Sequence, residues 1–185
     1  KEFSLKIGTA LKRMEQLIQS MLKITRIDAG SISFEKSNYS IPNIINHAIS
    51  ELTTRADNEK KEIVIDGDLE QMLYCDIEWT GEAIGNIIKN ALDHTDTGGK
   101  ISISWEQTPA MIRIFITDNG HGISQEDIHH IFKRFYRSKN TSESQGIGLG
   151  LPLAKAIVEG QGGILSVQSE LLQGTTFTLS FLTES

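Results

Sequence analysis

The sequence predicts an α+β fold: a two-layer sandwich in which helices cover one face of a mixed, mostly antiparallel sheet, preceded by a long N-terminal helix. Two observations predict this class. Segments whose apolar residues recur with helical spacing are interspersed with short segments that alternate apolar and polar residues, as half-buried strands do. The 185 residues also fit one ordinary domain with an appended element.

The N-terminal helix is predicted by a continuous apolar stripe. Its members are spaced by three or four residues and comprise Ile7, Leu11, Met14, Ile18 and Met21, widened by Leu17, Leu22 and Ile24. The helix ends at Asp28-Ala29-Gly30, where glycine can adopt the positive φ of a helix terminus. No second long helix pairs with it, which favours an intermolecular or truncated helical bundle. Packing of the stripe on the helix's own domain is the alternative.

From Ser31 onward, strand and helix patterns are mixed. Pro42 favours the first turn of a helix, and Asp76 and Ser124 are side chains that cap helix starts. The expected elements are a helix from Ser40 to about Asn58, strands at 62–66 and 72–75, a helix from Asp76 through about Thr95, strands at 100–106 and 111–117, a short helix from Ser124 toward Phe132, a polar loop at 138–145, a helix at 148–160, and strands at 164–169 and 175–182.

Composition excludes several classes of function. A net charge of −6 argues against sequence-independent binding to nucleic acid or to an anionic membrane, which depends on accumulated Lys and Arg. Cys75 is the only cysteine, so an internal disulfide or a cysteine metal cluster is excluded, and packing is its expected role. No run of about 18 apolar residues is present. The chain starts within a helix at Lys1, so we expect a fragment whose upstream portion contains membrane segments.

The first motif with chemical potential is the segment from Asn86 to Thr95. Asn86, Asn90 and His94 are spaced by four residues and therefore lie on one stripe of a helix. A carboxamide oxygen is a hard ligand of the kind that Mg²⁺ accepts while it retains water and phosphate ligands. Taken alone, the pair is weak evidence, and two polar surface residues are the favoured interpretation.

The second motif, from Asp118 to Ile123, follows an apolar strand. Gly120 and Gly122 permit close approach to the backbone, and a carboxylate at the end of a strand can accept a hydrogen bond from an exocyclic amine. Such a site selects adenine, because guanine presents a carbonyl at the same place and the two acceptors repel each other. A simple glycine turn is the alternative.

The third motif opens the helix expected at 148–160. Gly146, Gly148 and Gly150 alternate with Ile147, Leu149 and Leu151, and free N–H groups at a helix start attract phosphate. Neither a Rossmann fingerprint nor a P-loop is present. The preceding basic residues are Lys133, Arg134, Arg137 and Lys139, for which an ordinary solvated surface is the alternative.

These motifs, in this order, resemble the catalytic domain of bacterial sensor histidine kinases, which belongs to the GHKL superfamily with its Bergerat-like fold. Residues 86–95 resemble the family's N box, 118–123 and 146–151 its two glycine boxes, and 131–137 its F box; the segment from Gly174 to Phe177 is similar to its final motif. The resemblance implies that residues 1–30 are the second helix of a truncated dimerisation domain and that residues 31–185 form the ATP-binding catalytic domain.

The resemblance also implies roles for single residues. Asn90 would bind Mg²⁺, Asp118 would read the adenine amino group, and Thr175 would lie near the adenine. Asn86, His94 and Arg137 would lie by the phosphates. The remaining expected contacts with ATP come from Gly120, Gly122, Ile123, Phe135, Gly146, Gly148, Leu149, Gly150 and Leu151. Phe132 and Phe135 would pack the loop at 138–145 onto the domain.

The implied activity is transfer of the γ-phosphate of ATP to a histidine for relay to the receiver domain of a response regulator, by a protein that dimerises through its helical domain. Relatives that hydrolyse ATP carry Glu where this chain has Asn86, and a carboxamide is a poor general base. None of the five histidines precedes the Glu/Asp-x-x-x-Pro pattern of a family acceptor, so we expect the acceptor to be absent. Asp93 also departs from relatives, and its negative charge should weaken phosphate binding unless it points away.

Two other hypotheses are a serine kinase of the anti-sigma type and a degenerate nucleotide-binding or dimerisation module. The helix joined through Asp28-Ala29-Gly30 favours the sensor kinase over the first. The intact Asn90, Asp118 and loop glycines argue against the second.

Overall fold

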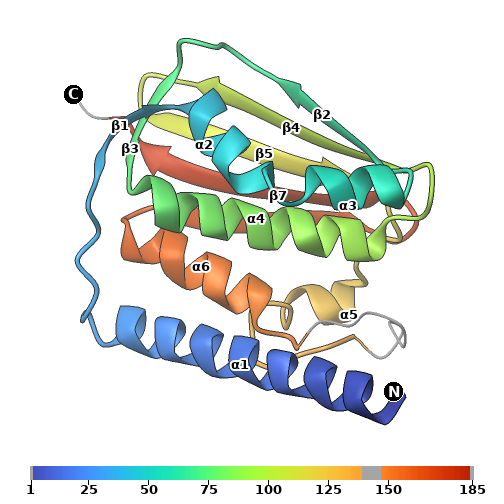
Figure 1. Cartoon of the computed structure of the whole chain (residues 1–185). Coiled ribbons are helices and arrows are strands. Elements are labelled where there is room, and N and C mark those ends of the chain that lie inside the picture. The colour runs from blue at the N-terminus through green and yellow to red at the C-terminus, as the bar shows by residue number, and fades with distance from the viewer. Residues whose placement is uncertain (1, 139–146, 184–185) are drawn as a thin grey trace.

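The chain forms a five-stranded sheet covered on one face by helices, with a long N-terminal helix beneath them (Figure 1). The computed structural model describes residues 2–138 and 147–183. The sheet has the strand order β2-β4-β5-β7-β6, in which β2 and β4 are parallel and the other neighbours antiparallel. The predicted class, a mixed and mostly antiparallel sheet with helices on one face, is confirmed.

The strands of this sheet lie where alternation predicts them, with differences of one residue or so at their ends. They are β2 (Glu62–Asp66), β4 (Lys100–Gln107), β5 (Met111–Asp118), β6 (Ile164–Glu170) and β7 (Gly174–Leu182). Alternate residues of β4 and β5, such as Ile103 and Ile114, are fully buried and face the helices. Asp118, the last residue of β5, pairs with Thr175 of β7, so the two residues lie at the same end of the sheet.

The chain also forms a two-stranded sheet, of which the sequence predicted only one strand. β3 (Met72–Cys75) is the predicted strand, and β1 (Ser37–Ser40) pairs with it antiparallel. β1 has the sequence Ser-Asn-Tyr-Ser and one apolar residue, so its sequence gave no alternation to recognise.

The helices α2 (Ile41–Ile49) and α3 (Thr53–Asn58) replace the single helix predicted from Ser40 to Asn58, and that prediction was wrong. The helix is interrupted by a turn at residues 50–52. There Leu52 donates its N–H to the carbonyl of Ile49, and its side chain is buried. Glu51 and Leu52 are good helix formers, so local propensity does not account for the break, and tertiary burial of Leu52 decides it.

The other helices are α4 (Ile77–His94), α5 (Gln125–Ile128) and α6 (Gly150–Gly160). Asp76 caps α4 as predicted, because its carboxylate accepts the N–H of Trp79 at 3.2 Å. Ser124 accepts the N–H of Asp127 at 3.1 Å, but α5 is shorter than the predicted helix. α6 begins two residues later than predicted.

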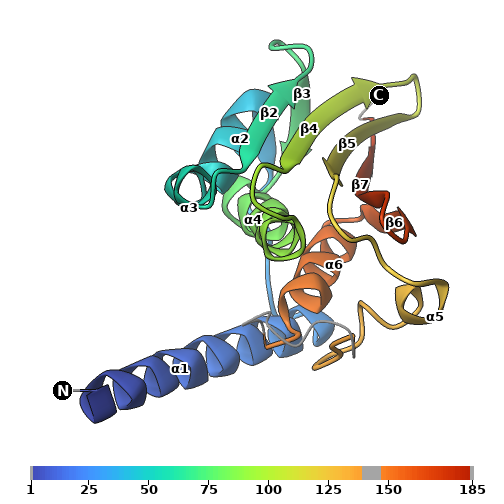
Figure 2. The same ribbon diagram turned by 90° about the vertical axis from the view of Figure 1, so that its right-hand side faces the viewer.

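Helix α1 (Glu2–Asp28) runs beneath α6 and extends past the rest of the molecule toward its N-terminus (Figure 2). Gly30 has the predicted positive φ of 63°. The apolar stripe divides into two flanks: Leu17, Met21 and Ile24 pack toward the domain, whereas Ile7, Leu11, Met14, Ile18 and Leu22 are exposed. Packing on the helix's own domain therefore holds for the first flank, and the intermolecular or truncated bundle stays a prediction for the second.

The hydrophobic core lies between the sheet and the helices and includes the fully buried Phe177, Ile84 and Ile87. Among the described residues, no helix is long and apolar enough to cross a membrane.

Candidate nucleotide-binding site

The site is built around the C-terminal half of α4, which carries the predicted stripe. Asn86 donates its Nδ2–H to the carbonyl of Glu82 at 3.0 Å, so its Oδ1 is left to face outward. Asn90 is half-buried, and its carboxamide has no hydrogen-bond partner within residues 2–138 and 147–183. Burial lowers the pKa of His94, which keeps its imidazole neutral near pH 7. The structure thus places all three side chains on the exposed edge of a well-anchored helix.

The carboxylate of Asp118 ends β5 and is only 4% exposed. Its Oδ1 accepts the N–H of Gly120 at 2.9 Å. Burial raises the pKa of Asp118, while hydrogen bonds from the backbone of Gly120 and Thr175 act in the opposite direction. A carboxylate at the end of a strand is where the sequence predicts it, and its contact with a ligand stays a prediction.

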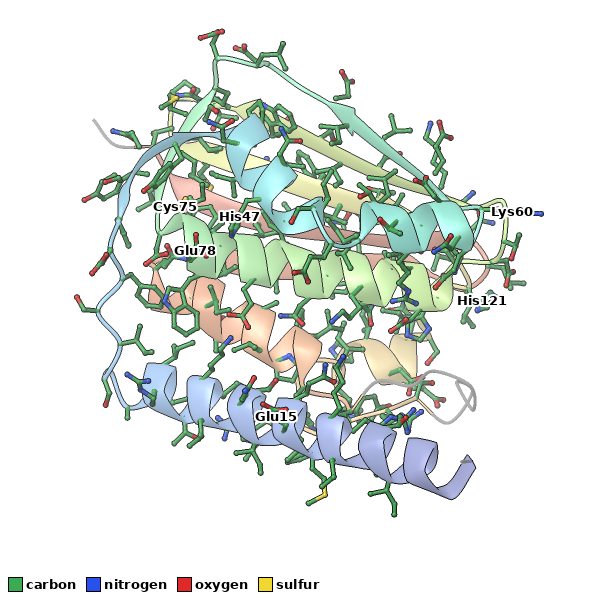
Figure 3. The ribbon with its side chains drawn as sticks, in the orientation of Figure 1. Glu15, His47, Lys60, Cys75, Glu78 and His121 are labelled. Atoms are coloured by element: carbon green, nitrogen blue, oxygen red, sulfur yellow. The ribbon has the colours of Figure 1, made fainter. Side chains whose placement is uncertain are left out.

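The turn after Asp118 is wedged between α4 and β6. A Cβ at Gly120 would lie 2.1 Å from the carbonyl oxygen of His94, and the N–H of His121 donates to that same oxygen at 3.0 Å. Figure 3 shows His121 beside the C-terminal end of α4. Gly122 has a φ of 69°, and a Cβ there would meet the carbonyl oxygen of Glu170 at 2.0 Å. Backbone contact therefore requires glycine at both positions.

On the far side of this turn, the N–H of Ile123 donates to Ser169 Oγ at 2.8 Å. The same hydroxyl lies 2.9 Å from Thr175 Oγ1. Thr175 is buried and pairs with Asp118 across β5 and β7, so it lies beside the carboxylate; its contact with adenine stays a prediction. Ile123 is half-buried and contributes apolar surface at the edge of the turn.

The start of α6 lies against α4. Gly148 has a φ of 77°, and no side chain caps the helix after Leu149. A Cβ at Gly150 would lie 3.2 Å from Asn86 Oδ1, which shows that the helix start faces the asparagine stripe. Leu151 is half-buried, and Gly146 lies outside the described residues.

The two helices present opposite ends to the site. The C-terminus of α4, with Asn90 and His94, carries the negative end of a helix dipole, which favours a cation. The N-terminus of α6 carries the positive end and uncapped N–H groups, which favour an anion. A metal ion and a phosphate group therefore both find a favourable field between them.

Residues 132–137 are the segment expected to contact the phosphates and the loop at 138–145. Phe132 packs edge-on against Phe177 with ring centroids 6.3 Å apart. Phe135 is 52% exposed and has a φ of 63°, and its N–H donates to the carbonyl of Gly148. Its predicted packing against the loop at 138–145 stays a prediction, because residues 139–146 lie outside the described residues. Arg137 is exposed and adjoins the undescribed segment 139–146.

The other basic residues of this segment do not gather at the site. Arg134 forms an ion pair with Asp28 at the end of α1, and Lys133 is exposed. Lys139 and the loop predicted at 138–145, apart from Ser138, lie outside the described residues.

Three polar clusters on the elements that carry the site escaped sequence reasoning. Asp127 accepts the hydroxyls of Tyr136 and of Ser138, the latter at 2.6 Å, and so holds the residues on both sides of Arg137. Gln161 Oε1 accepts the N–H of Asp76 at 2.8 Å.

The third cluster is the ion pair of Asp93 with Arg55. These partners are up to 85 residues apart, and no local pattern could have revealed them.

Comparison with known proteins identifies relatives of this arrangement. Residues 75–185 match the family described as histidine kinase-, DNA gyrase B-, and HSP90-like ATPase. The sensor protein SrrB of Staphylococcus aureus is 30% identical over 170 residues, which are 91% of this chain and 29% of SrrB. The chain thus spans less than a third of the length of this curated relative.

Solved structures share the fold. The histidine kinase AdeS of Acinetobacter baumannii superposes with a TM-score of 0.83 at 19% identity, over 97% of this chain and 83% of AdeS. The mycobacterial sensor histidine kinase MprB superposes with a TM-score of 0.70 at 25% identity, over 80% of this chain and 97% of the MprB chain. The first similarity includes α1, because it covers nearly the whole chain.

Proposed function

The chain belongs to the histidine kinase-, DNA gyrase B-, and HSP90-like ATPases, and we propose that it binds Mg·ATP and transfers the γ-phosphate to a histidine. It contains an ATP-binding catalytic domain of the histidine kinase type. The observation that carries the proposal is the buried carboxylate of Asp118. It lies beside Gly120 and Gly122, where close contact with neighbouring backbone leaves no room for a side chain, and next to α4, which carries the carboxamides of Asn86 and Asn90.

Selection of adenine follows from the chemistry of Asp118. An ionised carboxylate is an acceptor only, so it pairs with the amino group of adenine and repels the carbonyl of guanine. Its burial makes the discrimination strong, because a desolvated acceptor that faces another acceptor has no water to relieve it. Gly120, Gly122 and Thr175 shape the place where the base lies, and Ile123 adds apolar contact.

The residues by the phosphates divide into two groups. Asn90 is the metal ligand of our proposal, because its half-buried carboxamide lacks a partner among the described residues and sits at the negative end of α4. Magnesium, when bound, neutralises charge on the phosphate oxygens. Asn86, His94 and Arg137 line the phosphates, and Phe135 together with residues 146 and 148–151 forms the segment that approaches them.

Transfer is favoured over hydrolysis by Asn86. A carboxamide cannot take a proton from water, so a water molecule at this position lacks a general base. Catalysis then rests on positioning and on stabilisation of charge by Arg137 and by the N–H groups at the start of α6. A neutral imidazole of the acceptor histidine needs no base to attack the phosphorus.

The wider assembly is part of the same proposal. Residues 1–30 form the second helix of a dimerisation domain, and residues 31–185 form the catalytic domain. The exposed flank of α1 supports this division, because an isolated helix rarely leaves five large apolar side chains in water. The receiver domain of a response regulator takes the phosphate, and the catalytic domain of the membrane-anchored parent faces the cytoplasm.

Calorimetric titration of ATP and GTP, with and without magnesium, tests the proposal. We expect binding of ATP that depends on magnesium, no measurable binding of GTP, and loss of at least a tenfold factor in affinity in Asp118→Asn, because an amide can offer its N–H to the adenine amine. Asp66→Asn, which removes an exposed carboxylate from β2, is the matched control and should bind ATP normally.

Other outcomes would count against it. No binding of ATP by the natural chain would leave the degenerate interaction module as the better description. Equal binding of ATP and GTP would show that Asp118 does not read the base. Loss of magnesium dependence in Asn90→Ala is expected, and its persistence would contradict the assignment of the metal ligand.

A further inference from the structure

Asp93 is an acidic residue on the phosphate-facing side of α4. It follows Asn86 by seven residues, which is close to two full helical turns, so the two side chains leave the helix in nearly the same direction. Asn86 Oδ1 faces Gly150 at the start of α6. An unpaired carboxylate in this direction would face the same region as the phosphates and would repel them.

The structure shows where this carboxylate goes. Asp93 Oδ1 lies 2.6 Å from Nη2 of Arg55 on α3, which runs alongside the C-terminal part of α4 (Figure 1). The Nε of Arg55 also bonds Glu59 Oε1 at 2.6 Å, so the guanidinium is held from two sides. The bond from Asp93 therefore directs its carboxylate toward α3.

The group is balanced in charge and tied to the backbone of α4. Lys61 Nζ lies 2.6 Å from Glu59 Oε2 and donates to the carbonyl of Leu92 at 2.7 Å. Two acidic and two basic side chains thus form one connected set with no net charge, beside the last turn of the helix that carries Asn90. Removal of Arg55 alone would leave one uncompensated negative charge there.

We propose that Arg55 is a positioning residue for nucleotide binding, which holds the Asp93 carboxylate against α3 and cancels its charge so that α4 can accept the phosphates of ATP. The inference rests on the proposed function, because it needs phosphates at the junction of α4 and α6. It gives α3, which contributes no residue to the site, a direct influence on affinity for ATP.

Charge provides a readout that a purely structural role would not give. The Arg55 and Asp93 side chains are 34% and 25% exposed, and partly solvated ion pairs of this kind contribute little to folding stability. Repulsion by a freed carboxylate instead grows with the number of phosphates on the ligand. The effect should therefore be largest for ATP, smaller for ADP and absent for adenosine.

The experiment is a double-mutant cycle of Arg55→Ala and Asp93→Asn, with calorimetric titration of Mg·ATP, Mg·ADP and adenosine. We expect Arg55→Ala to weaken binding of ATP about fivefold and binding of ADP by a smaller factor. Asp93→Asn should bind ATP at least as well as the natural chain, and the double variant should regain natural affinity.

Arg113→Ala is the matched control, because Arg113 pairs with Glu106 on the sheet, at 3.4 Å and with similar exposure. It should leave all three affinities unchanged. Thermal unfolding of each variant checks that the fold is retained.

The outcomes separate the inference from the proposed function. If the natural chain does not bind ATP, the proposed function fails and the inference falls with it. If the natural chain binds ATP but Arg55→Ala binds equally well, loses adenosine to the same extent, or is not rescued by Asp93→Asn, the proposed function stands and the role of Arg55 is refuted.

Discussion

Replacement of Gly120 by alanine tests whether the turn after Asp118 is docked on α4. The added Cβ would lie 2.1 Å from the carbonyl oxygen of His94 and 2.9 Å from Asp118 Oδ1. The first neighbour is backbone at the end of α4 and cannot rotate away, so the turn and the helix must separate by roughly 1 Å or more. Overpacking of this kind costs about 1–3 kcal/mol. For a chain of this length, that lowers the unfolding midpoint by roughly 2–12 °C.

The assay combines thermal unfolding, followed by circular dichroism, with titration of Mg·ATP. We expect affinity to fall at least tenfold, because the same displacement moves Asp118 away from Asn90. Gly98→Ala is the control: its Cβ would meet nothing within 4 Å, and its φ of 84° adds only the cost of a left-handed residue, about 1 kcal/mol. Equal midpoints and equal affinities in the two variants would refute the docking argument.

Three further predictions follow from local features. Gly85→Ala, in α4, meets only the carbonyl of Ala48 at 3.4 Å and should raise stability by about 0.5–1 kcal/mol, measured by denaturant unfolding. Burial raises the pKa of the Cys75 thiol to about 11, so iodoacetamide at pH 8 should not alkylate the folded chain. Because the unfolded thiol ionises first, the free energy of unfolding should fall as the pH rises from about 9 to 11, and Cys75→Ala should remove this contribution. Incubation with γ-labelled ATP should leave all five histidines of the chain unlabelled; acid-labile label on any of them would contradict this.

Much of the fold could be predicted because its signals are local. Alternation located β4 and β5, and the caps Asp76 and Ser124 located two helix starts. β1 and the break between α2 and α3 could not be predicted, because each is decided by distant partners. Leu52 interrupts a helical pattern to reach the core, and no spacing within the segment records that.

The candidate site likewise has features with a local sequence signature and features without one. Glycines at 120 and 122 are required by backbone contacts with His94 and Glu170, and their spacing in the sequence is the signature of that requirement. The partner of Asp93 has no such signature, because Arg55 lies 38 residues away in an unremarkable helix. The sequence predicts the Asp93 carboxylate near the phosphates, and only the structure shows that it is paired with Arg55.

Asn86 offers the last argument for transfer rather than hydrolysis. Its Nδ2–H donates to the carbonyl of Glu82, one turn earlier in α4, which fixes the amide so that Oδ1 faces the start of α6. A glutamate at this position could not donate that bond, and its carboxylate would sit free beside the positive end of α6. The anchored side chain is a carboxamide and lacks the basicity of a carboxylate, which supports the proposed transfer over hydrolysis.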